Sequence, residues 1–452
     1  MAKKNPEPTR SPRERAFLVG VDLRNEPSLL SLDDSLDELA LLADTAGLEV
    51  VGETYQRLDK PSSDTFIGSG KLEEIKALVE ENLAQVVIFD NELAPRHLRE
   101  LEERLGPNVR IIDRTALILD IFAQHAQTRE GVLQVELAQY EYRLPRLTRA
   151  WTHLARQTGG GGGRTGSSGG VGLRGPGETQ LEVDRREIRK RISSLRAELE
   201  KVRAHRQRYR SQRQRSMIPI VALVGYTNSG KSTLLNRLAH SEVLVANQLF
   251  ATLDPTTRRV ELPGGHNILV TDTVGFIQKL PTQLVAAFRA TLEEIAEADL
   301  LLHLVDASHP TAREQIKAVE MTLSEIDAGH IPTLLVLNKL DRFPDRQQAL
   351  DLVSDYPGSV VGISALTGEG ISEMLAAIEK ELFETFLPVA VRLPYDQGSL
   401  ISLFHDQGKV DNVEHGRGGV VIEGSIPIRL LARYQPYLML ETQESSEDST
   451  AA

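Results

Sequence analysis

The stretch that decides the fold is Gly225-Tyr226-Thr227-Asn228-Ser229-Gly230-Lys231-Ser232-Thr233, which reads G-x-x-x-x-G-K-S. An apolar, β-branched run over 218–224 precedes it and is typical of a buried strand, and Leu234, Leu235 and Leu238 follow it at helical spacing. A strand, a glycine-rich loop and a helix start together form the context of a phosphate-binding loop. The alternative, a chance glycine turn with an exposed lysine, fits this context poorly.

The phosphate-binding loop predicts nucleotide contacts for every residue of 225–233. Its backbone N–H groups would turn toward the phosphates at the positive end of a helix dipole. Lys231 would reach the β- and γ-phosphates, and the Ser232 hydroxyl would bind Mg²⁺. Asn228 has two interpretations that stay open: it ligates K⁺ beside the phosphates, or it hydrogen-bonds to backbone groups of the loop.

A second motif, Asn338-Lys339-Leu340-Asp341, follows an apolar strand-like run and predicts which base is bound. The carboxylate of Asp341 can accept hydrogen bonds from guanine N1–H and the 2-amino group, and adenine offers neither donor there. Asn338 would support the base edge, and the stem of Lys339 would pack across the ring. Ser364-Ala365-Leu366 would direct a backbone N–H toward guanine O6. The order and spacing of these motifs predict a site for GTP and GDP.

Two further segments are expected at the γ-phosphate and the metal ion. Asp272-Thr273-Val274-Gly275 follows a strand-like run; Asp272 would bind Mg²⁺ through water, and the Gly275 N–H would contact the γ-phosphate. Phe250-Ala251-Thr252-Leu253-Asp254-Pro255 is expected to bring Phe250 to the nucleotide and Thr252 to Mg²⁺, with Thr256 or Thr257 as the alternative ligand. Ser232, Thr252 and Asp272 would together form the metal site.

The residues expected to act in hydrolysis are Lys231, Thr252 and Gly275. The position after Gly275 is Phe276, where many GTPases carry a glutamine that orients the attacking water. Phenylalanine cannot polarise water, so we expect the isolated protein to hydrolyse GTP slowly. Either a partner completes the site, or another group of the chain replaces the glutamine.

Composition excludes several classes of protein. The chain has 452 residues, of which 40% are apolar and 26% charged, so we expect a soluble globular protein of about three domains. It has no run of 18 apolar residues, and its N-terminal stretch lacks the apolar core of a secretory signal. Without cysteine it has no disulfides, Fe–S clusters or thiolate zinc sites, and its eleven histidines lack metal-ligand spacing. We expect a cytoplasmic location without a membrane span.

The predicted fold class is α/β, with six segments that differ in periodicity. These are a disordered tail (1–14), a small and largely parallel α/β domain (15–127), a helical hairpin (128–216) with a glycine-rich tip (158–177), a P-loop GTPase domain (217–388), a small α/β C-terminal domain (389–440) and an acidic tail (441–452). In the first domain, Gly68-Ser69-Gly70-Lys71 is similar to part of a phosphate loop. It favours a glycine turn that caps the next helix over a nucleotide contact.

The hairpin is predicted from two apolar seams that repeat every three and four residues. The first seam consists of Leu133, Leu137, Tyr140, Leu144, Leu147, Trp151 and Leu154, and the second of Ile188, Ile192, Leu195, Leu199 and Val202. Such seams, joined by a Gly- and Ser-rich stretch, indicate two antiparallel helices, with a kink expected at Pro145. Arms of about 25 residues would hold the tip nearly 40 Å from the body, at about 1.5 Å per residue.

The second arm of the hairpin is strongly basic. Residues 185–215 contain thirteen Arg or Lys and three Glu, a local charge of +10 in a chain whose total is −12. A solvated helix face usually mixes both signs, so this excess favours a surface that binds polyphosphate. Few aromatic residues lie among the arginines, which favours contacts with the backbone of folded RNA over base stacking.

Outside the general GTPase motifs, the chain resembles the HflX family of translational GTPases over nearly its whole length. The resemblance is carried by Phe66-Ile67-Gly68-Ser69-Gly70-Lys71, Arg143-Leu144-Pro145-Arg146-Leu147, Gly172-Leu173-Arg174-Gly175-Pro176-Gly177-Glu178-Thr179-Gln180-Leu181-Glu182 and Phe250-Ala251-Thr252-Leu253-Asp254-Pro255-Thr256-Thr257-Arg258. The run GPGETQLE is highly specific. A glycine-rich insertion over 159–170 departs from the family pattern, at the predicted tip.

The resemblance implies a cytoplasmic GTPase that binds the large (50S) ribosomal subunit and separates stalled or idle ribosomes into subunits, especially under stress. The first domain and the hairpin would reach rRNA near the peptidyl-transferase centre. Some family members also bind or hydrolyse ATP in the N-terminal part, and peripheral membrane association stays open. We expect a monomer. Two other functions remain: a GTPase of large-subunit assembly, and a nucleotide-gated RNA-binding switch.

Overall fold

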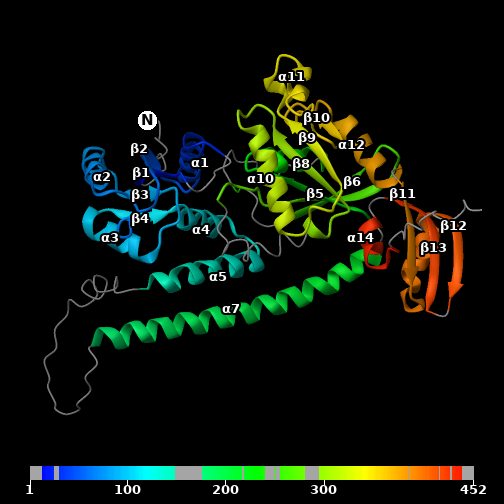
Figure 1. The fold of residues 1–452 in the computed structure, drawn as a ribbon, viewed down its shortest axis with the longest axis horizontal. Coiled ribbons are helices and arrows are strands. Elements are labelled where there is room, and N and C mark those ends of the chain that lie inside the picture. Colours follow the sequence, from blue (N-terminus) through cyan, green and yellow to red (C-terminus); the bar gives the residue numbers. More distant parts are fainter. Residues whose placement is uncertain are drawn as a thin grey trace, which may run out of the picture.

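The computed structural model describes residues 13–24, 30–147, 176–215, 218–239, 250, 255–279, 295–384, 386–416, 418–427 and 430–439. They form three α/β parts, arranged in a row, with a long helix that runs beneath them (Figure 1). The predicted α/β class is confirmed. Residues 158–175 of the predicted tip, most of the two tails and the apolar residues Trp151 and Leu154 lie outside the described residues, whereas 176 and 177 begin α7.

The N-terminal domain is a four-stranded parallel sheet with the order β2-β1-β3-β4. Its elements are β1 (Arg15–Leu23), α1 (Leu32–Thr45), β2 (Glu49–Leu58), α2 (Ser69–Glu81), β3 (Val86–Phe89), α3 (Pro95–Leu105), β4 (Arg110–Asp113) and α4 (Arg114–His125). The helices cover the sheet on two faces and enclose two apolar clusters, as is usual for parallel sheets of β-branched strands. Gly68 is the N-cap of α2, and the ammonium group of Lys71 lies 2.6 Å from Glu74.

The two arms of the predicted hairpin are α5 (Arg129–Arg146) and α7 (Pro176–Arg215). They run antiparallel, because Glu136 in the middle of α5 binds Arg191, whereas Leu147 just after α5 accepts a hydrogen bond from Arg185. The seam is confirmed where the helices overlap: Leu133, Leu137 and Tyr140 of α5 pack with Leu195, Leu199 and Val202 of α7. Pro145 lies in the last turn of α5 and marks the end of the helix, where the sequence predicted a kink.

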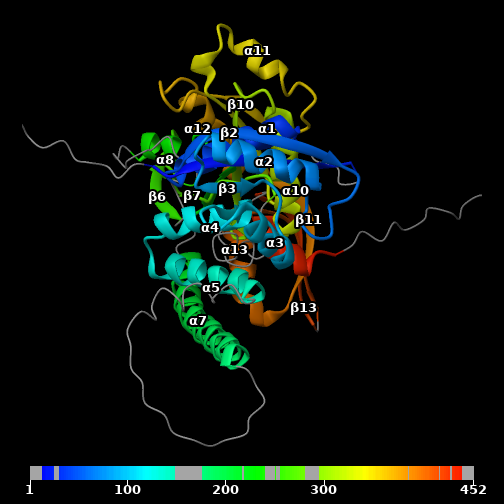
Figure 2. The same cartoon turned by 90° about the vertical axis from the view of Figure 1, so that its left-hand side faces the viewer.

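The described part of the first arm, α5, packs on two sides. It has 18 residues, and its other face packs on α4 through Val135, Ala138 and Tyr142. The rest of the predicted arm lies outside the described residues. The Tyr142 hydroxyl donates to Asp113 at 2.8 Å, and the Arg146 guanidinium lies 3.5 Å over the Tyr142 ring. The hairpin is therefore fixed to the N-terminal domain by α5, while α7 alone continues along the molecule (Figures 1 and 2).

The central domain is a six-stranded sheet with the order β10-β9-β8-β5-β7-β6, parallel except for β6. Its elements are β5 (Ile220–Gly225), α8 (Lys231–Leu238), β6 (Thr256–Glu261), β7 (Asn267–Asp272), β8 (Leu300–Asp306), α10 (Ala312–Glu325), β9 (Thr333–Asn338), η1 (Leu340–Arg342), α11 (Arg346–Asp351), β10 (Val360–Gly362), α12 (Ile371–Glu379) and η2 (Lys380–Glu384). Every residue of β8 is buried, so the sheet is covered on both faces.

The C-terminal domain is a three-stranded antiparallel sheet with the order β11-β13-β12. Its elements are β11 (Phe386–Leu393), η3 (Tyr395–Gln397), α13 (Gly398–Gln407), β12 (Lys409–Gly416), β13 (Gly419–Pro427), α14 (Leu431–Tyr434) and η5 (Gln435–Tyr437). Phe404 and Tyr434 join the helices to the sheet in one apolar core. β11 begins at Phe386, before the boundary that the sequence predicted after residue 388.

No helix in the described part of the chain is long and apolar enough to cross a bilayer. α7 is the longest of these helices, but charged residues dominate it. Three of its apolar side chains, Leu195, Leu199 and Val202, pack against α5.

Leu195 tests how strongly the two arms are held together. Its side chain is 0% exposed between α5 and α7. We expect Leu195→Ala to cost about 2–5 kcal/mol of local stability, because it removes buried methyl groups and leaves a cavity. Hydrogen exchange of α7 amides measures this cost. Leu41→Ala, at a side chain that is 55% exposed, is the control. Unchanged exchange in Leu195→Ala would contradict the packing.

Candidate nucleotide-binding site

The phosphate-binding loop connects β5 to α8, as the sequence predicts. Two glycines are required by its geometry. Gly225 has a φ of 147°, and a Cβ atom there would lie 2.2 Å from the Leu304 carbonyl oxygen. Gly230 has a φ of 97°, and its Cβ would lie 2.2 Å from the Asn338 amide nitrogen. Asn228 is exposed at the turn of the loop, with a φ of 61°.

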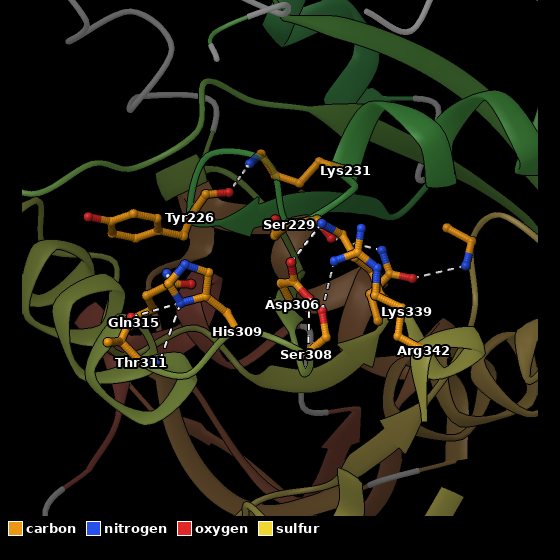
Figure 3. Close-up of polar contacts among 12 residues, drawn as sticks. Tyr226, Ser229, Lys231, Asp306, Ser308, His309, Thr311, Gln315, Lys339 and Arg342 are labelled. Carbon is orange, nitrogen blue, oxygen red and sulfur yellow. Dashed lines mark hydrogen bonds and ion pairs between the residues drawn. The ribbon is translucent and has the colours of Figure 1, made fainter. Parts of the chain in front are cut away.

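Lys231 is hydrogen-bonded to the backbone of the phosphate-binding loop. Its ammonium group donates to the carbonyl oxygens of Gly225 at 3.0 Å and Tyr226 at 2.8 Å (Figure 3). Burial lowers the pKa of Lys231 to about 8, although the charge of Asp272 opposes this change. A bound phosphate would supply the negative charge that this buried ammonium group lacks. His303, on β8 beside the loop, stays neutral because burial and the nearby Lys231 lower its pKa to about 3.

Two of the three predicted metal ligands come together. The Ser232 hydroxyl, at the start of α8, donates to Asp272 Oδ2 at 2.7 Å, at the end of β7. Oxygen ligands of this kind suit Mg²⁺, which usually takes one or two protein groups and completes its shell with phosphates and water. Among the described residues no cluster of three or more His, Asp or Glu could hold a metal by itself. The donor set therefore fits Mg²⁺ that arrives with a nucleotide.

The third predicted metal ligand, Thr252, lies outside the described residues. Of the alternatives, Thr257 lies in β6 and its hydroxyl is 3.0 Å from that of Thr271, while Thr256 pairs with Asp272 across the strands. Phe250 was expected at the nucleotide, but its side chain is 3% exposed and packs edge-on against Phe122 of the N-terminal domain. The described position of Phe250 therefore leaves its ring unavailable to a nucleotide.

Asn338 ties the base-binding motifs to the phosphate loop. Its amide nitrogen donates to the Ser229 carbonyl at 2.8 Å, and its amide oxygen accepts from the Ala365 N–H at 2.9 Å. Asp341 accepts a hydrogen bond of 2.5 Å from the Ser364 hydroxyl, which fixes one carboxylate oxygen. Hydrogen bonds thus join the phosphate loop, the motif at 338–341 and the motif at 364–366 to each other.

Lys339 is fixed by a residue that the sequence analysis missed. Lys339 has a φ of 65°, and its ammonium group lies 2.6 Å from Asp306 Oδ2 (Figure 3). The other Asp306 oxygen accepts from the Ser308 N–H at 3.1 Å and hydroxyl at 2.6 Å, and Arg342 donates to the same hydroxyl. Asp306 ends β8 opposite Asn338, which ends β9, so strand alignment was the signal that could have found it. This network fixes the side chain of Lys339, whose stem is expected to pack across the ring of the base.

Arg237 is a second missed residue. From α8 it donates to the carbonyl oxygens of Ala365 and Leu366 and so supports the loop that follows β10. The side chain of Leu366 itself is 72% exposed, so only its backbone takes part. An arginine in a helix gives no sequence signal for this role, because the contact spans 128 positions.

Residues 273–279, which follow β7, are called the switch segment here. Thr273 anchors its start, with its hydroxyl donating to the Leu223 carbonyl at 2.6 Å. The Phe276 side chain is buried in the apolar core beside Tyr226 and Ile295, so it does not face the phosphates. The described site therefore offers no side chain at position 276 that could orient water, in agreement with the expectation of slow hydrolysis.

Asp341→Asn tests the assignment of the base. The substitution changes one of the two carboxylate acceptors into a donor, so we expect at least about ten-fold weaker GTP binding and a preference for xanthine nucleotides. Equilibrium binding of labelled GDP and XDP measures this preference. Asp345→Asn, at the N-cap of α11 rather than at the site, is the matched control. If the Asp341 variant still prefers GDP as the parent does, the assignment is wrong.

Family models match the chain in four consecutive blocks. They are described as GTP-binding GTPase N-terminal (33–123), GTP-binding GTPase Middle Region (125–213), 50S ribosome-binding GTPase (220–339) and HflX C-terminal domain (353–433). Among solved structures, a GTP-binding protein from Sulfolobus solfataricus in complex with GDP is similar. It is 25% identical, with a TM-score of 0.42 and coverage of 81% of this chain and 98% of that chain.

Curated relatives are similar over nearly the full length. A GTPase HflX from Caldanaerobacter subterraneus is 43% identical over 94% of both chains, and a GTPase HflX from Escherichia coli K12 is 42% identical over 94% of this chain and 97% of its own. A third, from Magnetococcus marinus, is 45% identical over 88% and 90%. The four matched blocks and these identities agree with the guanine-binding arrangement described above: the chain belongs to the HflX family of GTPases.

Proposed function

We propose that this GTPase binds the large ribosomal subunit through its rRNA and uses GTP binding and hydrolysis to split stalled or idle ribosomes in the cytoplasm, under stress. The observation that carries the proposal is the unbalanced positive charge of α7, with thirteen basic and three acidic residues over 185–215. The match of 220–339 to a model described as a 50S ribosome-binding GTPase supports the same partner.

The charge that α7 offers to RNA is smaller than its sequence suggests. Arg191 donates hydrogen bonds to both carboxylate oxygens of Glu136, from Nε and from one terminal guanidinium nitrogen. The guanidinium of Arg196 lies 2.7 Å from Glu141. These two arginines hold the hairpin together. Arg186, Arg189 and Lys190 are exposed and have no ion pair among the described residues, so we assign the RNA contact to them. Backbone phosphates of folded RNA match such a row of cations.

We further propose a division of labour along the chain. The GTPase domain (217–388) would bind GTP through 225–233, Asp272, Gly275, Asn338 and Asp341. The N-terminal domain (15–127) and hairpin (128–216) would bind rRNA, and the C-terminal domain (389–440) would flank them in a monomer.

Mg²⁺, held by Ser232 and Asp272 with Thr252, would neutralise phosphate charge during hydrolysis. Lys231 would bind the β- and γ-phosphates, and the Gly275 N–H would contact the γ-phosphate.

Two further ligands were considered in the sequence analysis. K⁺ bound by Asn228 is the alternative to an asparagine that only hydrogen-bonds to the loop backbone. ATP binding near Gly68 has little support, because Lys71 is already paired with Glu74.

Two alternatives share the same site chemistry. A large-subunit assembly GTPase would bind immature 50S particles in preference to 70S ribosomes. A nucleotide-gated RNA switch would work fully with a non-hydrolysable GTP analogue. Sedimentation of 70S ribosomes with the protein and GTP distinguishes these two alternatives from a splitting factor, because only a splitting factor converts the 70S peak into subunits.

Ribosomes should accelerate hydrolysis strongly. Because Phe276 is buried and no glutamine follows Gly275, we expect turnover of isolated protein to be at least about a hundred-fold slower than with 50S or 70S particles. Phosphate release with and without particles, in Na⁺ and in K⁺ buffers, measures the ratio. Fast turnover by the isolated protein in Na⁺ buffer would contradict the proposal that a partner completes the site.

Charge reversal on α7 tests the RNA surface. The triple variant Arg186→Glu, Arg189→Glu and Lys190→Glu should bind GTP like the parent, while ribosome pelleting falls at least about ten-fold and becomes less dependent on salt. The control makes the same change in charge at other exposed cations, Arg99, Arg104 and Lys317. If pelleting by the α7 variant matches that by the control at two salt concentrations, the RNA site lies elsewhere.

A further inference from the structure

The last turn of α8 carries an arginine that binds the backbone beside the base-binding motif. Arg237 donates from Nε to the Ala365 carbonyl oxygen at 3.3 Å, and from a terminal guanidinium nitrogen to the Leu366 carbonyl oxygen. The two carbonyls belong to consecutive peptide units, which one planar guanidinium group can hold together. Because α8 begins at Lys231, this short helix contacts the phosphate loop at its start and the base-binding motif at its end.

Residues 364–369, called the base loop here, use nearly all of their backbone N–H groups within the protein. Hydrogen bonds to the described residues satisfy the N–H groups of five of the six residues, Ser364, Ala365, Thr367, Gly368 and Glu369. In the described part of the chain, no group accepts from the Leu366 N–H. A backbone donor needs an acceptor from the protein, from water or from a ligand. The Leu366 N–H is therefore the donor of the base loop that a ligand can use.

Arg237 fixes the direction of this donor. In a planar trans peptide unit, the C=O of one residue and the N–H of the next point in opposite directions. The peptide bond between Ala365 and Leu366 is trans. Since Arg237 holds the Ala365 carbonyl oxygen on the side of α8, the Leu366 N–H points away from α8. The second bond, to the Leu366 carbonyl, restricts rotation of the next peptide unit as well.

The chemistry of guanine brings O6 to the same loop. Asp341 is expected to accept from guanine N1–H and the 2-amino group, and O6 is bonded to the ring carbon next to N1. The Ser364 hydroxyl donates to Asp341 at 2.5 Å, so the base loop lies against this carboxylate. A guanine that binds Asp341 would therefore present O6 toward the base loop, where Leu366 offers its N–H.

We propose that Arg237 is a positioning residue for base recognition, which orients the Leu366 N–H toward guanine O6. Spacing alone left open which residue of 364–366 supplies this N–H, and the Ala365 N–H already donates to Asn338 at 2.9 Å. Arg237 touches no part of the nucleotide and acts through the base loop. A donor that is held in place before binding loses less freedom when the base arrives, so the hydrogen bond to O6 contributes more to affinity.

Arg237→Met in the full-length protein tests this role. The Arg237 side chain is exposed, so the substitution leaves the apolar core intact. The probes are GDP and 6-thio-GDP, which keeps N1–H and the 2-amino group but carries sulfur, a weaker acceptor, in place of O6. We expect GDP binding to weaken at least about five-fold and 6-thio-GDP binding less than about two-fold, because only GDP loses a strong hydrogen bond. Competition against labelled GDP measures both affinities.

Arg237→Lys is the conservative variant. An ammonium group is a point charge that lacks the planar fork of a guanidinium, so we expect an affinity ratio between those of the parent and Arg237→Met. Arg313→Met is the matched control, because Arg313 is also exposed and its Nε donates to a backbone carbonyl, that of Leu352, at 2.8 Å and outside the nucleotide motifs. Its affinity ratio should equal that of the parent.

Three results would overturn the proposal. They are an unchanged affinity ratio in Arg237→Met, an equal loss of affinity for GDP and 6-thio-GDP, which a merely structural role predicts, and a control that shifts the ratio as much. The measurement concerns the GTPase site of the isolated chain and needs no ribosomes. Its failure is therefore distinguishable from failure of the proposed function.

Discussion

The domain arrangement depends on the buried guanidinium group of Arg114, which must keep its carboxylate partners. Breaking a buried ion pair by removing one partner costs about 3–5 kcal/mol, so Arg114 must keep Glu38 and Asp90 close. Each of these carboxylates also binds the GTPase domain, through Tyr226 and Lys279. Glu38 and Asp90 therefore connect the nucleotide site to the N-terminal domain, because each binds both Arg114 and a residue of the GTPase domain.

The motifs that the sequence predicts for the nucleotide site lie close together in the structure, because they depend on local backbone geometry. Gly225 and Gly230 stand where a Cβ atom would collide with the chain, and Asn338 joins Ser229 to Ala365 through its amide. The missed residues act across long separations. Asp306 and Arg237 reach the site only after the sheet has formed, and the pairing of Glu38 with Tyr226 spans 188 positions. Residue type and spacing carry no information about such contacts.

The hairpin shows where periodicity is informative and where it fails. The heptad seams correctly predicted two antiparallel helices, because apolar spacing determines which face is buried. Spacing did not reveal that α5 has a second buried face, with Tyr142 bound to Asp113. Likewise Phe250 was expected at the nucleotide, and only the fold shows that it fills the N-terminal core beside Phe122. The hairpin thus packs on the N-terminal domain through α5 and forms one unit with it.

The central claim is that the buried charges around Arg114 hold the N-terminal domain and the GTPase domain in one arrangement. The chain has no cysteine, so spin labels can be placed at Tyr55→Cys in β2 and Met321→Cys in α10, both exposed in the parent. Pulsed electron spin resonance then measures the distance between the two domains in the parent and in the Lys279→Met variant. We predict one narrow distribution for the parent and a clearly broader one for the variant, which lacks the ion pair with Asp90. The same distribution in both proteins would contradict the account.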